Sequence, residues 1–334
     1  RLTELLNESV DEKIVGKKLS EIFEGKGLLL QEKAISVDLK KKKLKTEKRE
    51  VDYDYLILAP GSVTNYFGNE RLRQNTIDYK DYAAMVRIKH KMREVIKQAS
   101  EQNKQMHFVV VGGGFTGVEL ICSLREAVLR EMAKYSMAKE SAKFILVQGG
   151  QTIMPALEEK PRAVVEQYLK NHGIEVRTNT VVEDITGTTL TTKNNEKLEG
   201  DLIAWTAGIV ASNIEFSETI SKERGNCIPV TPTGQMALHD DVYVIGDIGL
   251  CNEDGKLLPP TAQVAFQEGV RVGKNLRSRI LGNAQKPFKY RHLGTLIVLG
   301  HDFGMLTRGS ITLKGKLGWY FRDLAYRFRF WQLT

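Results

Sequence analysis

The sequence predicts an α/β fold, on three observations. Residues 107–111 form an apolar, β-branched run that leads directly into Gly-x-Gly-x-x-Gly between Gly112 and Gly117, and then into a helix-compatible segment. Strand-like and helix-like runs alternate after this turn, as a parallel sheet with crossover helices requires. A further apolar strand ends in Gly246-Asp247. With 334 residues, the chain is expected to form two domains and an appendage rather than one core.

The segment before the glycine turn is expected to be mostly β-structure. Residues 1–30 read as loop and short helix, and a β-meander follows with strands at 34–39, 44–51 and 55–59. Residues 78–100 carry apolar side chains at helical spacing and form a connecting helix.

The glycine turn lies in a block of alternating strands and helices that ends near residue 210. Its expected elements are a strand from 106, a helix to about 138, a strand at 143–147, a helix at 161–171, a strand at 174–177, a hairpin at 180–200 and a strand from 201. After it we expect a strand at 241–245, a helix at 261–280 and, from about 287, short strands with an aromatic and basic tail.

Composition excludes several classes of protein. The 3 cysteines lack CxxC spacing, which argues for a reducing compartment and against a disulfide framework, a zinc site or the cysteine pair of a disulfide reductase. The 6 histidines are scattered, so no metal site is expected. The net charge of +8 comes without a nucleic-acid motif, so an anionic dinucleotide and an anionic membrane surface are the expected partners, and not nucleic acid. No apolar stretch reaches the ~20 residues that span a bilayer.

The glycine turn is typical of a pyrophosphate-binding site. Gly112 permits the tight turn, Gly114 lets the backbone approach phosphate oxygens, and Gly117 lets the helix pack on its strand. Gly113 and Thr116 complete the motif. Phosphates then meet the free N–H groups and the positive dipole end of the helix. The alternative, a tight turn without a ligand, is weaker because strand, turn and helix come in the required order.

Taken together, the chain resembles the two-dinucleotide-binding-domain (Rossmann-like) flavoproteins, and more narrowly the type II, non-proton-pumping NADH:quinone oxidoreductases. The resemblance covers nearly all of the chain. It rests on the motifs at 52–62, 64–68, 111–119, 205–208, 245–247 and 262–269. Asn-Tyr-Phe-Gly at 65–68 and Ala-Gln-Val-Ala-Phe-Gln-Glu-Gly at 262–269 are the narrow signals, whereas the other motifs are shared across the superfamily.

The resemblance implies four functional segments. They are a partial FAD-binding domain (1–85), an NAD(P)H-binding Rossmann-like domain (86–212), the second half of the FAD-binding domain with a quinone-side helix (213–286), and a C-terminal amphipathic, membrane-associating region (287–334). The family's first Gly-x-Gly-x-x-Gly, which binds FAD, has no counterpart in this sequence. We therefore expect an incomplete first domain, and a chain that binds FAD poorly as it stands.

The resemblance also implies the residues that bind FAD and NAD(P)H. The expected cofactor contacts are Ala59, Pro60, Gly61, Gly112, Gly113, Gly114, Thr116, Gly117, Glu119, Gln148, Ala207, Gly208, Gly246, Asp247, Gln263, Val264 and Ala265. For Asp247, a helix N-cap or turn role is the alternative. Gln148 departs from the family pattern, because the end of this strand normally carries an acidic residue that binds the ribose and repels a 2′-phosphate. A neutral amide lacks that repulsion, so NADPH is expected to be tolerated.

Three residues are expected to be catalytic. Gln263 and Gln267 are four apart and share one helix face, which the resemblance places beside the flavin ring and the quinone. Their amides could hydrogen-bond a quinone carbonyl, although ordinary surface glutamines are the alternative. Glu119 is expected near the nicotinamide, to position the ring or pass protons. Its alternative is a first-turn carboxylate that complements the helix dipole.

The tail over residues 317–331 predicts an amphipathic helix at a membrane surface. An apolar stripe recurs every three or four residues, with arginines roughly opposite. Tryptophan and tyrosine among basic residues are typical of the headgroup region, and a core-packing terminal helix is the alternative. We expect a peripheral protein on the cytoplasmic or mitochondrial face of a membrane, with a homodimer as the candidate assembly.

The expected reaction passes a hydride from NAD(P)H to FAD and two electrons on to a membrane quinone. A sulfide:quinone oxidoreductase is one alternative, since Cys251 lies soon after Gly246-Asp247, but it has no evident partner cysteine. A flavin-deficient fragment that acts only as a nucleotide-binding module is the other.

Overall fold

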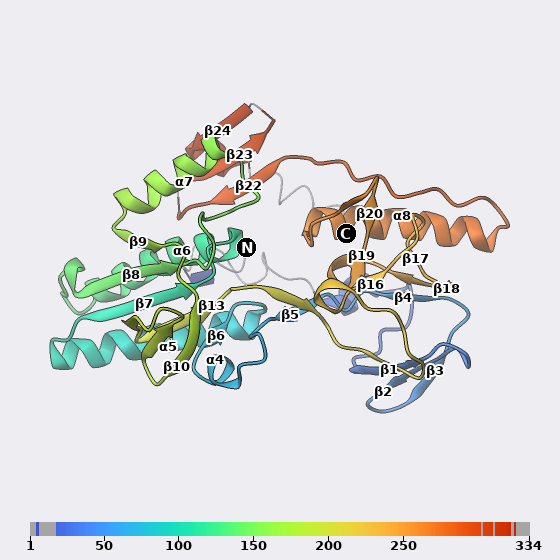
Figure 1. Ribbon diagram of the computed structural model, residues 1–334, viewed down its shortest axis with the longest axis horizontal. Coiled ribbons are helices and arrows are strands. Elements are labelled where there is room, and N and C mark those ends of the chain that lie inside the picture. Colours follow the sequence, from blue (N-terminus) through green and yellow to red (C-terminus); the bar gives the residue numbers. More distant parts are fainter. Residues whose placement is uncertain (1–4, 7–17, 302, 310, 322–323, 325–334) are drawn as a thin grey trace. The chain divides into compact units, whose positions relative to one another are not determined.

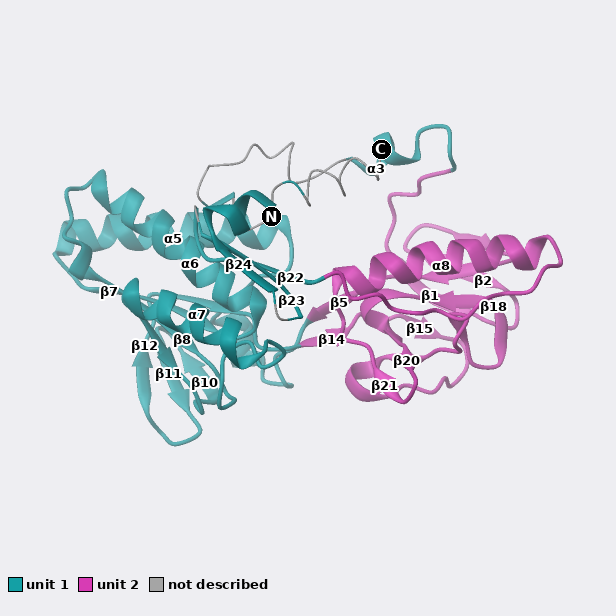
Figure 2. Ribbon diagram, turned by 90° about the horizontal axis from the view of Figure 1, so that it is seen from above, with its two compact units in different colours: residues 1–27, 64–208, 294–334 teal, residues 28–63, 209–293 magenta. Residues whose placement is uncertain are grey.

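The computed structural model describes residues 5–6, 18–301, 303–309, 311–321 and 324. Its contacts divide the chain into two compact units, coloured separately in Figure 2. Unit 1 comprises 1–27, 64–208 and 294–334, and unit 2 comprises 28–63 and 209–293. The functional boundaries at 85, 212 and 286 stay a prediction. No helix among the described residues is long and apolar enough to cross a membrane.

Unit 1 is built on a five-stranded parallel sheet with the order β6-β13-β7-β8-β9 (Figure 1). Its strands are β6 (Ile77–Asp78), β13 (Leu202–Trp205), β7 (Met106–Val111), β8 (Ala142–Val147) and β9 (Ile174–Arg177). The central strands are continuous apolar runs because both faces of the sheet are covered. This arrangement confirms the predicted α/β class.

The two faces of this sheet contact different layers. Phe108, Val110 and Leu146 point into a core shared with the helices α5 (Tyr82–Gln102), α6 (Phe115–Ala133) and α7 (Glu159–Asn171). Val109 and Val111 point the other way, into a core shared with a small antiparallel sheet. That sheet consists of β10 (Val182–Thr186), β11 (Thr189–Thr192) and β12 (Lys197–Glu199).

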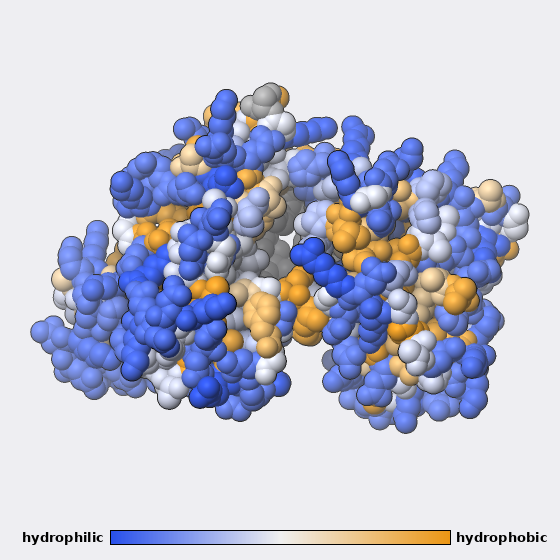
Figure 3. All heavy atoms as spheres, in the orientation of Figure 1, coloured by the Kyte–Doolittle hydropathy of each residue, from blue (hydrophilic) through white to orange (hydrophobic). Residues whose placement is uncertain are grey.

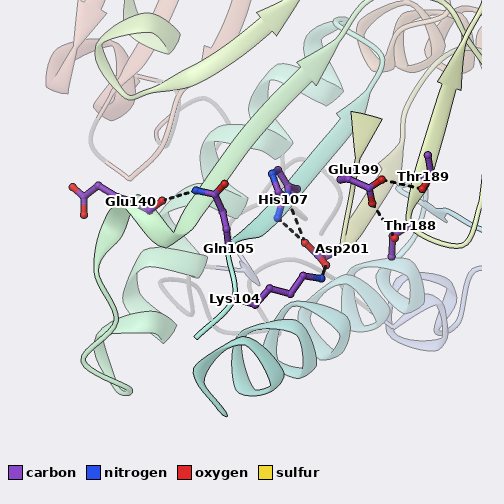
Figure 4. A network of polar contacts seen from close by, with 8 residues as sticks. All are labelled: Lys104, Gln105, His107, Glu140, Thr188, Thr189, Glu199 and Asp201. Carbon is purple, nitrogen blue, oxygen red and sulfur yellow. Dashed lines mark hydrogen bonds and ion pairs between the residues drawn. The ribbon is translucent and has the colours of Figure 1, made fainter. Parts of the chain in front are cut away.

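Polar contacts hold the amino ends of the central strands together (Figure 4). The Asp201 carboxylate accepts hydrogen bonds from the backbone N–H of His107 at 2.8 Å and from Lys104 Nζ at 3.0 Å. These contacts tie the start of β13 to the start of β7. The glycine turn begins at the opposite, carboxyl ends of these strands, which is where open α/β sheets bind ligands.

A C-terminal antiparallel sheet packs on α6 within unit 1. It consists of β22 (Thr295–Val298), β23 (Gly304–Arg308) and β24 (Ile311–Gly315). Ile297, Leu299 and Met305 are fully buried in the same core as the helices. The sheet is thus part of the unit 1 core rather than a separate appendage.

Unit 2 has two sheets of three or four strands, the two-stranded sheets β16-β19 and β20-β21, and one long helix. One of the larger sheets has the order β15-β1-β2-β3, and the other has the order β17-β18-β4. Their bounds are β15 (Glu215–Phe216), β1 (Ala34–Asp38), β2 (Lys43–Thr46), β3 (Glu50–Asp52), β17 (Gln235–Met236), β18 (His239–Val244) and β4 (Leu56–Leu58). The long helix is α8 (Ala262–Ile280).

The remaining elements are short. They are α3 (Leu19–Phe23), α4 (Glu70–Gln74), β5 (Ser62–Thr64), β14 (Ile209–Ala211), β16 (Ile228–Pro229), β19 (Gly249–Leu250), β20 (Asn252–Glu253), β21 (Lys256–Leu257), and the 3₁₀ turns η1 (Lys139–Ser141), η2 (Arg224–Asn226) and η3 (Gly246–Ile248).

Several predicted elements differ from the observed ones. The connecting helix expected at 78–100 begins at Tyr82, after β6, and β4, expected as the last strand of the β-meander, pairs with β18 instead. The strand expected at 44–51 is interrupted after Thr46, whose hydroxyl accepts the backbone N–H groups of Lys48 and Arg49 and so forms a turn. The helix expected to reach 138 ends at Ala133. The hairpin expected at 180–200 contains three strands, because a further turn separates β11 from β12.

Candidate functional site

The glycine turn of unit 1 is tight enough that two of its glycines are obligatory. Gly112 has φ +113°, and a Cβ there would lie 2.6 Å from Thr206 Oγ1 and 2.7 Å from Ala207 N. A Cβ on Gly117 would overlap the carbonyl oxygen of Gly112. The Thr206 hydroxyl lies within 3.0 Å of the carbonyl oxygens of Val111 and Gly112 and donates to this pair. Thr206 was not predicted as a site residue.

The N-terminus of α6 presents free donors. Gly114 is its N-cap, makes no side-chain cap, and has no heavy atom within 4 Å of the place a Cβ would occupy. Among the described residues, none accepts a hydrogen bond from the backbone N–H of Gly114, Phe115 or Thr116. An open space lined by unpaired N–H groups at the positive end of a 19-residue helix fits an anionic pyrophosphate.

Gln148 is in contact with the turn itself. Its Oε1 accepts the N–H of Gly113 at 2.9 Å, and its Nε2 donates to the carbonyl oxygen of Thr152 at 3.1 Å. The amide therefore holds the turn against the end of β8. Contact of Gln148 with a ribose stays a prediction.

The two motifs near residues 65 and 205 come together in unit 1. Trp205 Nε1 donates to the carbonyl oxygen of Asn65 at 3.0 Å, and the Trp205 ring lies 5.8 Å from that of Tyr66. The N–H of Asn65 donates to the carbonyl oxygen of Gly208 at 3.2 Å, and Gly208 has φ +87°. The Asn-Tyr-Phe-Gly motif thus supports the segment that carries Ala207 and Gly208, at the same edge of the sheet as the glycine turn.

The structure contradicts one of the two roles predicted for Glu119. It lies beyond the first turn of α6, which carries no acidic residue, so its interpretation as a first-turn carboxylate is wrong. Its Oε1 accepts the N–H of Val298 at 2.9 Å and holds β22 on the helix. A role near the nicotinamide stays a prediction.

Unit 2 contains a cavity of about 350 Å³. Asp247 and Gly246 lie on its wall, and Asp247 Oδ2 accepts a hydrogen bond from Ser62 Oγ at 2.5 Å. Gly61, the residue before Ser62, has φ +71° and open space where a Cβ would lie. Ala59 and Pro60 are exposed at the end of β4. The cavity is large enough for part of a dinucleotide, and its carboxylate, hydroxyl and glycines are typical of a flavin-nucleotide site.

A buried acid and two thiols line the same cavity. Glu268 is 7% exposed, and its Oε2 accepts the N–H of Gly246 at 2.7 Å. Burial raises the pKa of Glu268, and the Cys251 thiol is hydrogen-bonded to it. Burial raises the pKa of Cys251 to about 12, so this group is a thiol at neutral pH. Cys227 Sγ lies 3.4 Å from the carbonyl oxygen of Asp247, and Cys227 lines the same cavity as Cys251.

Helix α8 turns two faces to two different parts of unit 2. Val264, Ala265 and Glu268 line the cavity. Gln267 instead pairs with the backbone of Arg291, accepting its N–H and donating to its carbonyl oxygen at 3.0 Å each. Gln263 Oε1 accepts the N–H of Leu293 at 3.2 Å. The amide pair therefore holds the segment before β22, and its contact with a quinone stays a prediction.

The sheet of unit 1, its glycine turn and the Gly-Asp cavity of unit 2 define a class of protein, the α/β dinucleotide-binding oxidoreductases. The family model for pyridine nucleotide-disulphide oxidoreductases matches residues 3–269. A type II NADH:quinone oxidoreductase from Haemophilus influenzae is 31% identical over 307 residues, which cover 84% of this chain and 69% of that protein. The chain belongs to the pyridine nucleotide-disulphide oxidoreductase family and, within it, to the type II NADH:quinone oxidoreductases.

Solved structures show the same fold. NDH2 from Plasmodium falciparum, in complex with NADH, superposes with a TM-score of 0.87 at 19% identity, over 97% of this chain and 86% of that one. The sulfide:quinone oxidoreductase from Aquifex aeolicus superposes with a TM-score of 0.81 at 14% identity, over 99% and 81%. Both likenesses confirm the predicted Rossmann-like flavoprotein fold.

Proposed function

We propose that this protein oxidises NADH and reduces a quinone through bound FAD. The proposal rests on the N-terminus of α6, where backbone N–H groups without hydrogen-bond partners among the described residues border open space. The turn that precedes this helix has no room for a side chain at Gly112 or Gly117. Family membership supports the choice of substrates, since the relative from Haemophilus influenzae is named for NADH and quinone. Sulfide as the donor is the weaker choice, because it leaves this anion-binding turn without a ligand.

The residues of unit 2 fit the FAD nucleotide. Asp247, fixed by Ser62, would accept hydroxyl hydrogens, while Gly61 and Gly246 allow close approach of the backbone. FAD, when bound, supplies the capacity to accept a hydride and to deliver two electrons. The protein binds and orients the reactants and excludes water, and no side-chain nucleophile is required.

The residues of unit 1 would bind NADH. The N–H groups at 114–116 would hold the pyrophosphate, and Ala207 and Gly208 would lie beside the dinucleotide at the same sheet edge. Gln148 offers no negative charge there, so NADPH would bind as well.

On the quinone side, we place Gln263 and Gln267. Backbone groups of Arg291 and Leu293 form hydrogen bonds with these two amides, and these hydrogen bonds fix the orientation of the amides. A quinone carbonyl would compete for the Nε2 donors without trapping charge.

Association with a membrane belongs to the proposal. The described start of the tail exposes Leu317 (65%), Phe321 (43%) and Leu324 (52%), three members of the predicted apolar stripe. The rest of that stripe lies outside the described residues. We propose a peripheral protein on the cytoplasmic or mitochondrial face of a membrane, with a homodimer as its candidate assembly.

The direct test is steady-state NADH oxidation by purified, flavin-loaded protein with a soluble quinone analogue. We expect quinone-dependent loss of NADH absorbance. If the flavin content is stoichiometric and neither NADH nor NADPH is oxidised, the proposal is wrong.

A further inference from the structure

A row of polar side chains joins Gln263 to solvent within unit 2. The Tyr290 hydroxyl donates to Gln263 Oε1 at 3.4 Å and lies 3.2 Å from His292 Nδ1. Gln263 and Tyr290 are half-buried, whereas His292 is exposed. The three side chains therefore form a continuous path from water to the amide that we place at the quinone.

The backbone that carries this row is held by two elements. The N–H of Tyr290 donates to Glu253 Oε1 in β20 at 3.2 Å, and the N–H of Leu293 donates to Gln263 Oε1 in α8 at 3.2 Å. Figure 1 shows that the chain after α8 runs back along the helix toward its beginning. The Tyr290 and His292 side chains are therefore fixed beside the first turns of α8.

The row lies next to the cavity of unit 2. Val264 and Ala265, which follow Gln263 in α8, line that cavity. Apolar residues reach the surface in the region of β19, β20 and α8 (Figure 3). A quinone is an apolar ring with two carbonyl oxygens, so it fits a place where apolar groups border hydrogen-bonding side chains.

Reduction of a quinone requires protons as well as electrons. The overall reaction converts NADH, one proton and quinone into NAD⁺ and quinol. One hydrogen of the two new O–H groups corresponds to the hydride of NADH, and the other comes from water. The amides of Gln263 and Gln267 carry no ionisable proton and cannot pass one on. A tyrosine hydroxyl and an imidazole can do so.

We propose that Tyr290 and His292 relay this proton from water to the quinone. Tyr290 Oη would give its proton to a quinone carbonyl oxygen as the two electrons arrive, so that one O–H bond breaks and the O–H bond of the quinol forms. The protonated imidazole of His292 would then return a proton to Tyr290 from Nδ1, and His292 would regain one from water.

The geometry at Gln263 allows this exchange. The hydrogen bond from Tyr290 to Gln263 is long at 3.4 Å, so a quinone oxygen beside the amide would displace it. The inference rests on the proposed function, which supplies the electrons and places the quinone at Gln263. The alternative is that Tyr290 and His292 only hold the segment 290–293 on α8.

The test compares two electron acceptors in flavin-loaded protein, by stopped-flow absorbance of the flavin. In Y290F and H292A we expect flavin reoxidation by a soluble quinone to slow at least about tenfold. Ferricyanide takes electrons without protons, so reoxidation by ferricyanide should change less than about twofold. Imidazole in the buffer should restore H292A but not Y290F. Y135F and H90A are the matched controls, because Tyr135 and His90 are exposed in unit 1, and both should leave all rates unchanged.

A second measurement tests the placement without flavin. In NMR spectra of the chain with isotope-labelled histidine, the soluble quinone should shift the imidazole signals of His292, identified by their absence in H292A, and not those of His90. The inference is wrong if His292 does not respond. It is also wrong if Y290F slows quinone and ferricyanide equally, since a structural role would impair both, or if imidazole fails to restore H292A.

Failure of the proposed function would look different. NADH would then reduce the flavin of the unaltered chain with neither acceptor present nor any turnover with either. Flavin reduced by dithionite and reoxidised by the quinone would still measure the relay in the same variants.

Discussion

At the scale of single residues, the glycine turn contains two kinds of position. At one kind a side chain would clash with the backbone, and at the other the backbone borders open space. Gly117 packs against the carbonyl of Gly112, whereas Gly114 faces open space although both belong to one motif. The motif therefore combines a glycine required by packing with a glycine that faces open space, and substitutions can separate the two roles.

Replacing Gly114 with Ala should leave the fold intact and impair coenzyme binding. Its φ of −74° suits alanine, and the added methyl would project into the space proposed for the pyrophosphate. We expect KM for NADH to rise about tenfold or more with little change in thermal stability. G117A is the comparison variant, and should lose folded protein because its Cβ overlaps Gly112 O. An unchanged KM for G114A would contradict the proposed site.

Coenzyme preference should respond to Gln148. In Gln148→Glu the carboxylate can still accept the N–H of Gly113, and it adds a charge that repels a 2′-phosphate. We expect the ratio of kcat/KM for NADH over NADPH to rise about tenfold. Gln151→Glu, close by in the sequence, tests whether any added charge acts the same way. Equal ratios in the two variants would show that Gln148 does not face the coenzyme.

Stability should depend on pH through Glu268. Because burial raises its pKa above the unfolded value of 4.5, the folded chain holds this proton more tightly than the unfolded chain does. The stability it contributes is complete below pH 4.5 and is lost as pH rises through the folded pKa. In Glu268→Gln this loss should vanish, so the variant should gain about 2 °C or more in Tm relative to the unaltered chain between pH 5 and pH 8. Exposed Glu166→Gln is the control, and parallel pH curves for E268Q and the unaltered chain would contradict the assignment.

At the scale of elements, two carboxylates on α6 hold the C-terminal sheet. Glu119 accepts the N–H of Val298 and Glu126 accepts that of His301, both at 2.9 Å. The residues are seven apart, so they lie on one side of the helix. The backbone N–H groups of Val298 and His301 therefore find acceptors on α6 rather than on a neighbouring strand.

Gly300 should be critical for this docking. It has φ +100°, and a Cβ there would overlap Glu126 Oε1 and lie 2.9 Å from Tyr168 Oη. Gly300→Ala should lower the free energy of unfolding by about 2 kcal/mol or more, since both backbone strain and a clash result. Gly309→Ala shares a positive φ of +56° but has open space around it, and should cost only about 1 kcal/mol. Thermal unfolding of both variants measures the difference, and equal losses would show that the clash is relieved by movement.

At the scale of the whole molecule, the open question was which reductant such a fold serves. Folds of this kind accompany both NADH and sulfide chemistry, as the two solved neighbours illustrate. Cys227 and Cys251 share one cavity, which sulfide chemistry would need, but burial raises the pKa of both thiols and disfavours the reactive thiolate.

Replacing Cys251 with Ser distinguishes these reactions. Serine replaces the thiol with a hydroxyl that can still donate to Glu268, so NADH oxidation should persist within about threefold, whereas a sulfide oxidase would lose its sulfur carrier. Quinone reduction is measured with NADH and then with sulfide as the donor. Sulfide-dependent turnover that disappears in C251S would reverse the assignment.

Local chemistry in the chain was sufficient to predict the α/β class, the glycine turn and the order of the main strands and helices. Those features follow from short-range sterics and from the period of apolar residues, which neighbours in sequence alone control. The partners of individual polar groups were beyond such reasoning. Gln148 on Gly113, Glu119 on Val298 and Ser62 on Asp247 all join residues distant in sequence. Because a buried polar group bonds to whatever folding brings within about 3 Å, long-range packing settled these contacts.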